Sequence, residues 1–155
     1  MISPFDTELM LAPLGDGKNF VVARDFIARL DGLTIVVKRG FITDLTSIPR
    51  IFWWILDRWG KYGFAAVVHD FLYWMQFTEI PKARADLIFY RLMIMSGTPK
   101  LTARVIYLAV KYFGGIAWRN NAKQKKSDGF CEMNGDIIRW PQWAKQIREP
   151  NIKYG

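Results

Sequence analysis

The stretch that most constrains this chain is Ala65–Tyr73, an apolar run that contains the only histidine of the sequence. Within it His69 stands next to Asp70, so two ionisable side chains lie among residues that favour burial. Burying such groups costs several kcal/mol unless they are paired or hydrogen-bonded. The run therefore predicts a buried helix whose polar pair needs partners from elsewhere in the chain.

The pattern around this run predicts a helix over residues 62–75, in which Ala65, His69 and Tyr73 share one face. A second helix is expected over residues 83–95, after Thr78 as N-cap and Pro81 in the first turn. It carries Asp86, a second carboxylate on a largely apolar element.

A third helix opens at Thr98–Pro99, where an N-cap residue precedes a proline suited to the first turn. Its expected end is Gly114–Gly115, since glycine commonly terminates helices. The apolar stripe of this helix consists of Leu101, Val105, Leu108 and Tyr112.

Ahead of the helices, residues 20–23, 26–30 and 33–38 are rich in β-branched and aromatic side chains, which is typical of strands. Asp31–Gly32 separates the last two and predicts a tight hairpin turn. The expected fold class is therefore α+β, with a small N-terminal antiparallel β-sheet packed against about three α-helices. Residues 1–118 form the single expected domain.

Residues 119–155 are expected to form a basic connector and an irregular tail packed on the domain surface. The net charge of +8 permits attraction to nucleic acid, anionic lipid or an anionic cell-wall polymer and does not choose among them. The partner that we expect is an anionic polymer, either cell wall or nucleic acid. No uninterrupted 18-residue apolar run occurs, so we expect no membrane insertion. A single cysteine, Cys131, excludes an internal disulfide and suits a reducing cytoplasm.

The loop over residues 40–50 mixes a carboxylate, hydroxyl groups and a proline. Asp44 and Ser47 either accept hydrogen bonds from the nearby backbone or point into a cleft from the end of the sheet. Residues 51–59 are densely aromatic, which favours a core-facing helix or a lid.

Three motifs then combine: Gly40–Arg50 (GFITDLTSIPR), His69–Tyr73 (HDFLY) and Ala85–Phe89 (ADLIF). Together they resemble an uncharacterised family of small tailed-phage and prophage proteins, over roughly residues 20–115. The resemblance implies a phage or prophage origin, a location in the host cytoplasm or the virion, and other virion proteins as partners. It supplies no activity. The positions that it marks as a shared site are Asp44, Ser47, Pro49, His69, Asp70, Tyr73 and Asp86.

Two chemical hypotheses follow from these residues. A histidine with carboxylates can act as a general base or bind one divalent metal, with Asp44, His69 and Asp86 as the metal ligands. In the hydrolase hypothesis the substrate is cell wall or a nucleotide. The catalytic candidates are His69, Asp70, Asp44 and Ser47, and the binding candidates are Arg50, Tyr73 and Asp86.

Known templates fit poorly, because His-Asp phosphohydrolases and His-Glu-x-x-His peptidases need a second histidine, and no Gly-x-Ser-x-Gly elbow surrounds Ser47. The alternative is that His69, Asp70 and Asp86 form a buried polar network that clamps two helices onto the loop, with Arg50 or Arg84 as counter-charge. In that case the protein is a non-catalytic virion component, associated with tail or capsid, or a host-interaction protein. Whether the protein is an enzyme is open at this point.

Overall fold

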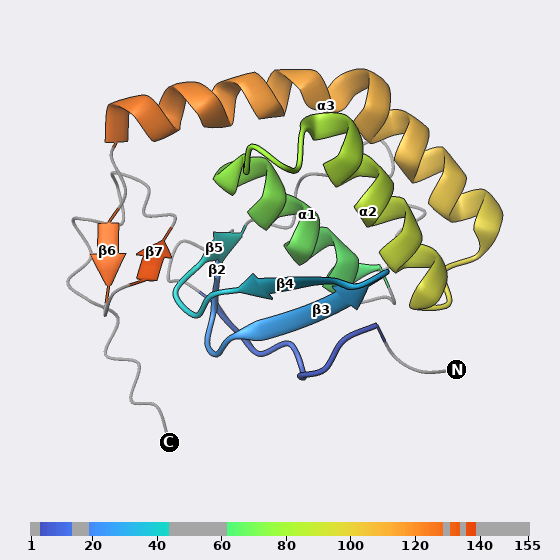
Figure 1. The fold of residues 1–155 in the computed structure, drawn as a ribbon, viewed down its shortest axis with the longest axis horizontal. Coiled ribbons are helices and arrows are strands. Elements are labelled where there is room, and N and C mark those ends of the chain that lie inside the picture. The colour runs from blue at the N-terminus through green and yellow to red at the C-terminus, as the bar shows by residue number, and fades with distance from the viewer. Residues whose placement is uncertain (1–3, 14–18, 44–61, 129–130, 134–135, 139–155) are drawn as a thin grey trace.

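The computed structural model describes residues 4–13, 19–43, 62–128, 131–133 and 136–138, and side chains as far as Lys123. Four of the site positions named above, Asp44, Ser47, Pro49 and Arg50, lie outside this part of the chain, as does the aromatic segment 51–59. The described residues form an antiparallel β layer followed by three helices, which confirms the predicted α+β class (Figure 1).

The β layer consists of two small antiparallel units. Strands β1 (Leu11–Pro13), β2 (Phe20–Val22) and β5 (Ile42–Thr43) pair in the order β1-β2-β5. Strands β3 (Phe26–Leu30) and β4 (Leu33–Val37) form a hairpin with Leu30 opposite Leu33. The predicted antiparallel strands are confirmed, but β2 belongs to one sheet and β3 and β4 to another.

The turn of this hairpin is Asp31–Gly32, as expected. Both residues have positive φ angles, 49° and 78°, which match the type I′ turn that suits the twist of a two-residue hairpin. On β3, buried and less buried side chains alternate, because one face of the hairpin packs on the helices.

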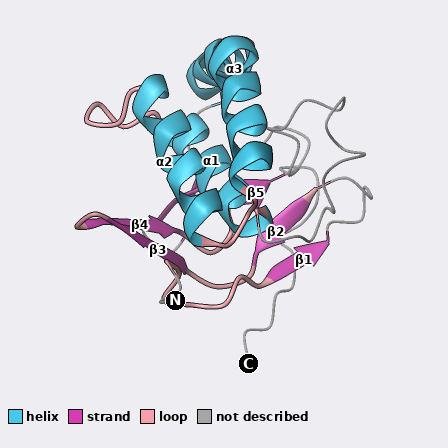
Figure 2. Ribbon diagram, turned by 90° about the vertical axis from the view of Figure 1, so that its right-hand side faces the viewer, coloured by secondary structure: helices cyan, strands magenta, loops and turns pink. Residues whose placement is uncertain are grey.

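The three helices are α1 (Gly63–Met75), α2 (Lys82–Met95) and α3 (Lys100–Asp128). They lie together on one side of the strands, so the described part of the protein has two layers (Figure 2). Helix α1 lies next to the sheet, and α3 runs along the outer edge of the helical layer (Figure 1). None of the helices in the described regions is long and apolar enough to cross a membrane.

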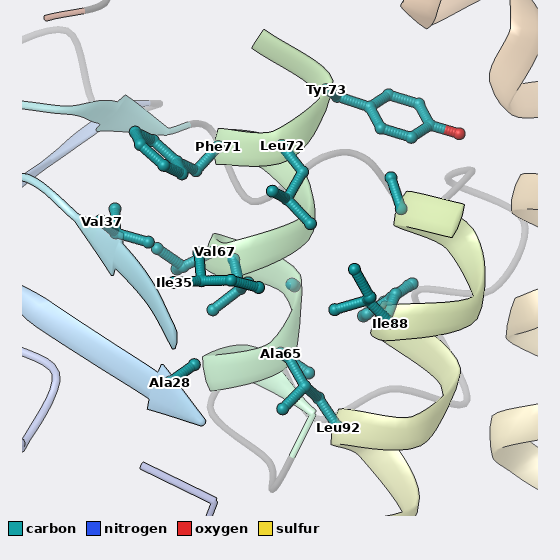
Figure 3. Packing of buried hydrophobic residues seen from close by; sticks show 14 of the residues in the cluster. Ala28, Ile35, Val37, Ala65, Val67, Phe71, Leu72, Tyr73, Ile88 and Leu92 are labelled. Atoms are coloured by element: carbon teal, nitrogen blue, oxygen red, sulfur yellow. The ribbon is translucent and has the colours of Figure 1, made fainter. Parts of the chain in front are cut away.

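Helix α1 forms the centre of the core. Every residue from Ala65 to Trp74 is buried. Val67 and Phe71 point toward Ile35 and Val37 of β4, while Leu72 points toward α2 (Figure 3). The run predicted to be a buried helix is therefore covered on both sides, by the sheet and by α2.

Helix boundaries depart from the prediction in two places. The N-cap of α2 is Pro81, in an extended conformation, and Thr78 is not the cap. Helix α3 continues through Gly114–Gly115 to Asp128, so the predicted helix end is wrong. A glycine pair weakens a helix by about 1 kcal/mol per residue, which tertiary packing can outweigh.

The first part of the predicted connector, residues 119–128, is thus the C-terminal part of α3, although the division of the chain at residue 118 stays a prediction. Beyond α3, strands β6 (Cys131–Met133) and β7 (Asp136–Ile138) pair antiparallel, where an irregular tail was expected.

The apolar stripe of α3 lies on the side opposite the core. Leu101 and Tyr112 are exposed, whereas the buried face of the helix consists of Ala103, Ile106, Ala109 and Val110. Small side chains on that face let α3 approach α1 and α2 closely, and larger ones would hold it away.

Candidate functional site

His69 of α1 and Asp86 of α2 form the centre of a buried polar cluster. Nε2 of His69 lies 3.0 Å from Oδ1 of Asp86. Both side chains are inaccessible to solvent, since His69 is 0% exposed and Asp86 is 1% exposed. The cluster therefore joins α1 and α2, and with them the motifs His69–Tyr73 and Ala85–Phe89.

Two further donors saturate the carboxylate. The hydroxyl of Tyr73 donates to Oδ1 of Asp86 at 2.6 Å, and Nζ of Lys82 donates to Oδ2 at 2.7 Å. Lys82 also donates to the backbone carbonyls of Val110 and Lys111, at 3.0 and 3.2 Å. One ammonium group thus ties α2 to the middle of α3.

Gly114 lets α3 approach this cluster. A Cβ atom placed on it would lie 2.4 Å from the hydroxyl oxygen and 3.3 Å from Cζ of Tyr73. Such contacts are far closer than van der Waals separation, so only glycine fits against the phenol ring. Gly115 is different, because its Cβ would meet only Arg119, at an ordinary 3.7 Å.

Aromatic rings enclose the imidazole of His69. The centroid of the Phe89 ring lies 4.5 Å away with an interplanar angle of 20°, a stacked arrangement. The Tyr73 ring lies 4.1 Å away at 45°. This apolar enclosure raises the cost of charging the imidazole and fixes its orientation toward Asp86.

The protonation states follow from these surroundings. Desolvation by burial lowers the pKa of His69 below its usual value, although the hydrogen bond and the charge of Asp86 oppose the shift. For Asp86, burial raises the pKa, but hydrogen bonds from His69, Lys82 and Tyr73 outweigh it, so the net pKa is lowered. Burial and the adjacent Asp86 raise the pKa of Tyr73. At neutral pH the cluster therefore contains a carboxylate, a neutral imidazole and a neutral phenol.

A neutral imidazole beside a carboxylate places its single N–H proton on Nε2, where it donates to Asp86. Nδ1 then carries a lone pair. Among the described residues this buried nitrogen has no hydrogen-bond partner. Of the polar atoms in the cluster, Nδ1 is the one still available to accept a proton or bind a ligand.

Asp70, the neighbour of His69 in sequence, belongs to a different contact. Its Oδ2 accepts a hydrogen bond of 2.5 Å from Oγ1 of Thr43, at the end of β5. Asp70 therefore connects α1 to the sheet, whereas His69 connects α1 to α2. The hydrogen bonds of His69 and of Asp70 that join described residues thus lie on two sides of α1, because adjacent helical residues point about 100° apart, although the charge of Asp70 also contributes to raising the pKa of Tyr73.

Of the seven predicted site residues, the structure brings together His69, Tyr73 and Asp86. The counter-charge was expected to be Arg50 or Arg84. Arg84 instead donates to the backbone carbonyl of Glu79, and Arg50 is not described. Lys82 supplies the positive charge.

The sequence interpretation missed Lys82, Thr43 and Gly114. Lys82 and Asp86 are four residues apart, the spacing at which oppositely charged side chains pair on a helix, so this contact was detectable. Thr43 lies twenty-seven residues from its partner Asp70, and no local signal links them. The close approach of Gly114 depends on the path of α3.

Within the described regions, no group of three histidine, cysteine, aspartate or glutamate side chains could hold a metal ion. The cation beside Asp86 is the Lys82 ammonium. The predicted ligand set of Asp44, His69 and Asp86 includes a residue outside those regions, so it stays a prediction.

Comparison with known proteins found no match among curated proteins and none among solved structures. A match was found to a family described as "Protein of unknown function (DUF1353)", over residues 20–110. This region includes β2–β5, α1, α2 and the first part of α3, and with them His69, Tyr73, Lys82 and Asp86. The chain therefore belongs to this family of unknown function.

Proposed function

We propose that this is a phage or prophage protein that works by binding and not by turnover, with the His69–Asp86 contact as an internal clamp. The observation that supports this most directly is that both side chains are sealed, 0% and 1% exposed. A general base must come within hydrogen-bond reach of the proton that it removes. Asp86 also has three donors on its two oxygens, which leaves little capacity for a substrate.

The binding role that we favour is that of a virion component, associated with tail or capsid, or of a host-interaction protein in the host cytoplasm. The net charge of +8 suits an anionic partner, such as an acidic protein surface, cell wall or nucleic acid.

The test compares the wild-type chain with His69→Gln, which keeps a polar side chain but cannot act as a base. Particles from a strain that carries the gene are purified, their proteins identified by mass spectrometry, and their infectivity titrated. We expect to find the chain in the particles or crosslinked to a host protein. We also expect that particles with a folded His69→Gln chain keep their infectivity. Lost infectivity with a folded variant still present in the particles would contradict a purely binding role.

One observation favours a second candidate, a hydrolase. The lone pair on Nδ1 of His69 is free of partners in the described regions, while Nε2 is oriented by a carboxylate, which is the arrangement of a general base. In this hypothesis Asp44 and Ser47 complete the site, and the substrate is cell wall or a nucleotide.

Hydrolysis of purified peptidoglycan and of nucleoside triphosphates, with and without divalent metal, tests this second candidate. Turnover by wild type that disappears in folded His69→Gln and persists in Asp31→Asn, which changes an exposed carboxylate, would support the hydrolase and overturn the binding role. If no preparation shows turnover, the hydrolase hypothesis is rejected.

A further inference from the structure

The outer face of α3 bears a continuous row of apolar side chains, which we call the outer stripe. Leu101, Tyr112 and Ile116 are 76%, 71% and 61% exposed. Val105 and Leu108 lie between them and are also exposed. These five positions recur every three or four residues, so they lie on one side of the helix over about 22 Å.

The apolar face is broader than a pairing seam. Phe113, which is 66% exposed, lies about 100° around the helix from Tyr112. At the level of Tyr112, Phe113 and Ile116 the exposed apolar side chains therefore span about 100° of the helix, whereas nearer Leu101 the direction of Phe113 belongs to the buried face. A two-helix coiled coil buries a narrower a/d strip, so this face is better suited to a broad, flat surface than to one partner helix.

The charged residues of α3 are all basic from Lys100 to Lys126, and Asp128, its last residue, is the acidic exception. Residues 100–127 contain no Asp or Glu. Arg104 and Lys111 lie along one edge of the outer stripe, and Arg119 and Lys123 continue its line toward the C-terminus; all four are exposed. A second copy of the chain would bring like charges together, whereas an anionic surface complements them.

The location of α3 leaves this face accessible. The helix runs along the outer edge of the molecule in one view and lies at the end of the helical layer in the perpendicular view (Figures 1 and 2). Its opposite face packs through Ala103 and Ile106. Four of the five side chains in the outer stripe are aliphatic and provide no stacking for nucleic-acid bases, and within the stripe Tyr112 alone is aromatic. The apolar row therefore suits lipid better than nucleic acid.

We propose that the outer stripe of α3 docks the protein on an anionic lipid bilayer. Leu101, Tyr112 and Ile116 enter the boundary between headgroups and acyl chains, while Arg104 and Lys111 reach lipid phosphates. The helix lies in the interface and does not cross the bilayer. This proposal goes beyond the proposed function, since it uses another face of the protein and does not depend on His69.

The test is flotation of the full-length chain with vesicles of phosphatidylcholine alone, or containing about one-third phosphatidylglycerol. We expect flotation with the anionic vesicles, little with phosphatidylcholine alone, and release at high salt, because salt screens charges near the surface. Failure to float with anionic vesicles would overturn the proposal.

Two matched pairs of variants locate the contact. Leu101→Ser combined with Tyr112→Ser should weaken partitioning about tenfold or more, whereas Leu87→Ser, at an exposed apolar position on α2, should not change it. The second pair tests charge. Arg104→Gln combined with Lys111→Gln should also weaken partitioning about tenfold or more, and Arg91→Gln on α2 much less.

Circular dichroism of each variant verifies the fold, and the exposed positions make unfolding unexpected. If the charge variant and its Arg91→Gln control lose vesicle binding equally, total charge and not this face drives the binding, and the proposal is overturned.

Sedimentation gives a second outcome that would overturn it. If the wild-type chain is a dimer and Leu101→Ser with Tyr112→Ser abolishes the dimer, the outer stripe pairs two copies of the chain.

Discussion

Asp86 accepts hydrogen bonds from three side chains, and its charge is balanced by Lys82 at 2.7 Å. Burying an isolated carboxylate is very unfavourable, but one that accepts several hydrogen bonds beside a cation is tolerated. The same contacts connect all three helices, because Tyr73 and His69 belong to α1 and Lys82 reaches backbone carbonyls of α3. The stability of the helical layer should therefore depend on this one side chain.

Replacing Asp86 by Asn should lower the free energy of unfolding by about 3–5 kcal/mol, because it leaves the Lys82 ammonium without its charge partner. Urea denaturation followed by circular dichroism measures the change.

The matched control is Asp31→Asn, which removes an exposed carboxylate that pairs with Arg91. Exposed ion pairs contribute about 0–1 kcal/mol, and asparagine tolerates the positive φ of this turn position. Similar losses in the two variants would contradict a special role for Asp86.

The single histidine makes the pH dependence of stability easy to assign. Burial lowers the pKa of His69 in the folded protein, so between pH 6.5 and that lower value the unfolded chain binds one more proton than the folded chain. Stability should therefore decrease as pH falls below 6.5, by at most about 1.4 kcal/mol per pH unit. Asp86 is ionised in both states above pH 5 and does not contribute there.

Urea denaturation at pH 7.0, 6.0 and 5.5 measures this decrease, and His69→Gln should abolish it. A wild-type stability that is constant over this range, or a slope that survives in the variant, would show that the imidazole is not held neutral.

The contact between α1 and α3 depends on which residue of α3 faces Tyr73. Helix α3 continues through two adjacent glycines, and each has a different environment. One lies against the buried phenol and the other beside a flexible arginine. Substituting each glycine by itself therefore distinguishes the effect of helix propensity on stability from the effect of packing, within one helix.

Gly114→Ala should lower the free energy of unfolding by about 1–2 kcal/mol. The new methyl group would displace the Tyr73 ring and weaken its 2.6 Å hydrogen bond to Asp86, and this overpacking outweighs the gain in helix propensity. Gly115→Ala should raise it by up to about 1 kcal/mol, since its methyl group meets only ordinary contact. Thermal or urea denaturation of both variants provides the comparison.

Tyr73→Phe combined with Gly114→Ala gives the control, because removing the hydroxyl relieves the closest contact. The double variant should lose less than the sum of the single losses. Strict additivity would mean that the hydroxyl and Gly114 do not interact.

Across the whole described structure, burial decreases outward from α1. That helix is covered by the sheet and by α2, whereas α3 packs by one face only and is largely exposed beyond Tyr112 (Figures 1 and 3). Local opening is expected to be cheapest where few apolar contacts must break.

Amide hydrogen exchange should therefore be slowest in Val67–Leu72 and fastest, among the helices, in Arg119–Lys123. Exchange followed by mass spectrometry at pH 7 measures both segments. Equal protection in the two segments would show that the C-terminal half of α3 is stabilised by contacts outside the described residues.

The sequence by itself determined the local features. Alternating β-branched residues, the Asp31–Gly32 turn and the apolar run Ala65–Tyr73 predicted the β layer, the hairpin and the central helix, because these depend on local conformational preference and periodicity. It also identified His69 and Asp86 as polar residues on apolar elements that required partners.

Only the tertiary structure decided which partners these were. Asp70 accepts a hydrogen bond from Thr43 of β5, and Lys82 supplies the positive charge beside Asp86. It also decided that α3 runs through its glycines and turns its small side chains inward, which leaves Leu101 and Tyr112 outside. The physical reason is that close helix packing depends on which faces fit together in space, and a single helix does not encode its neighbours.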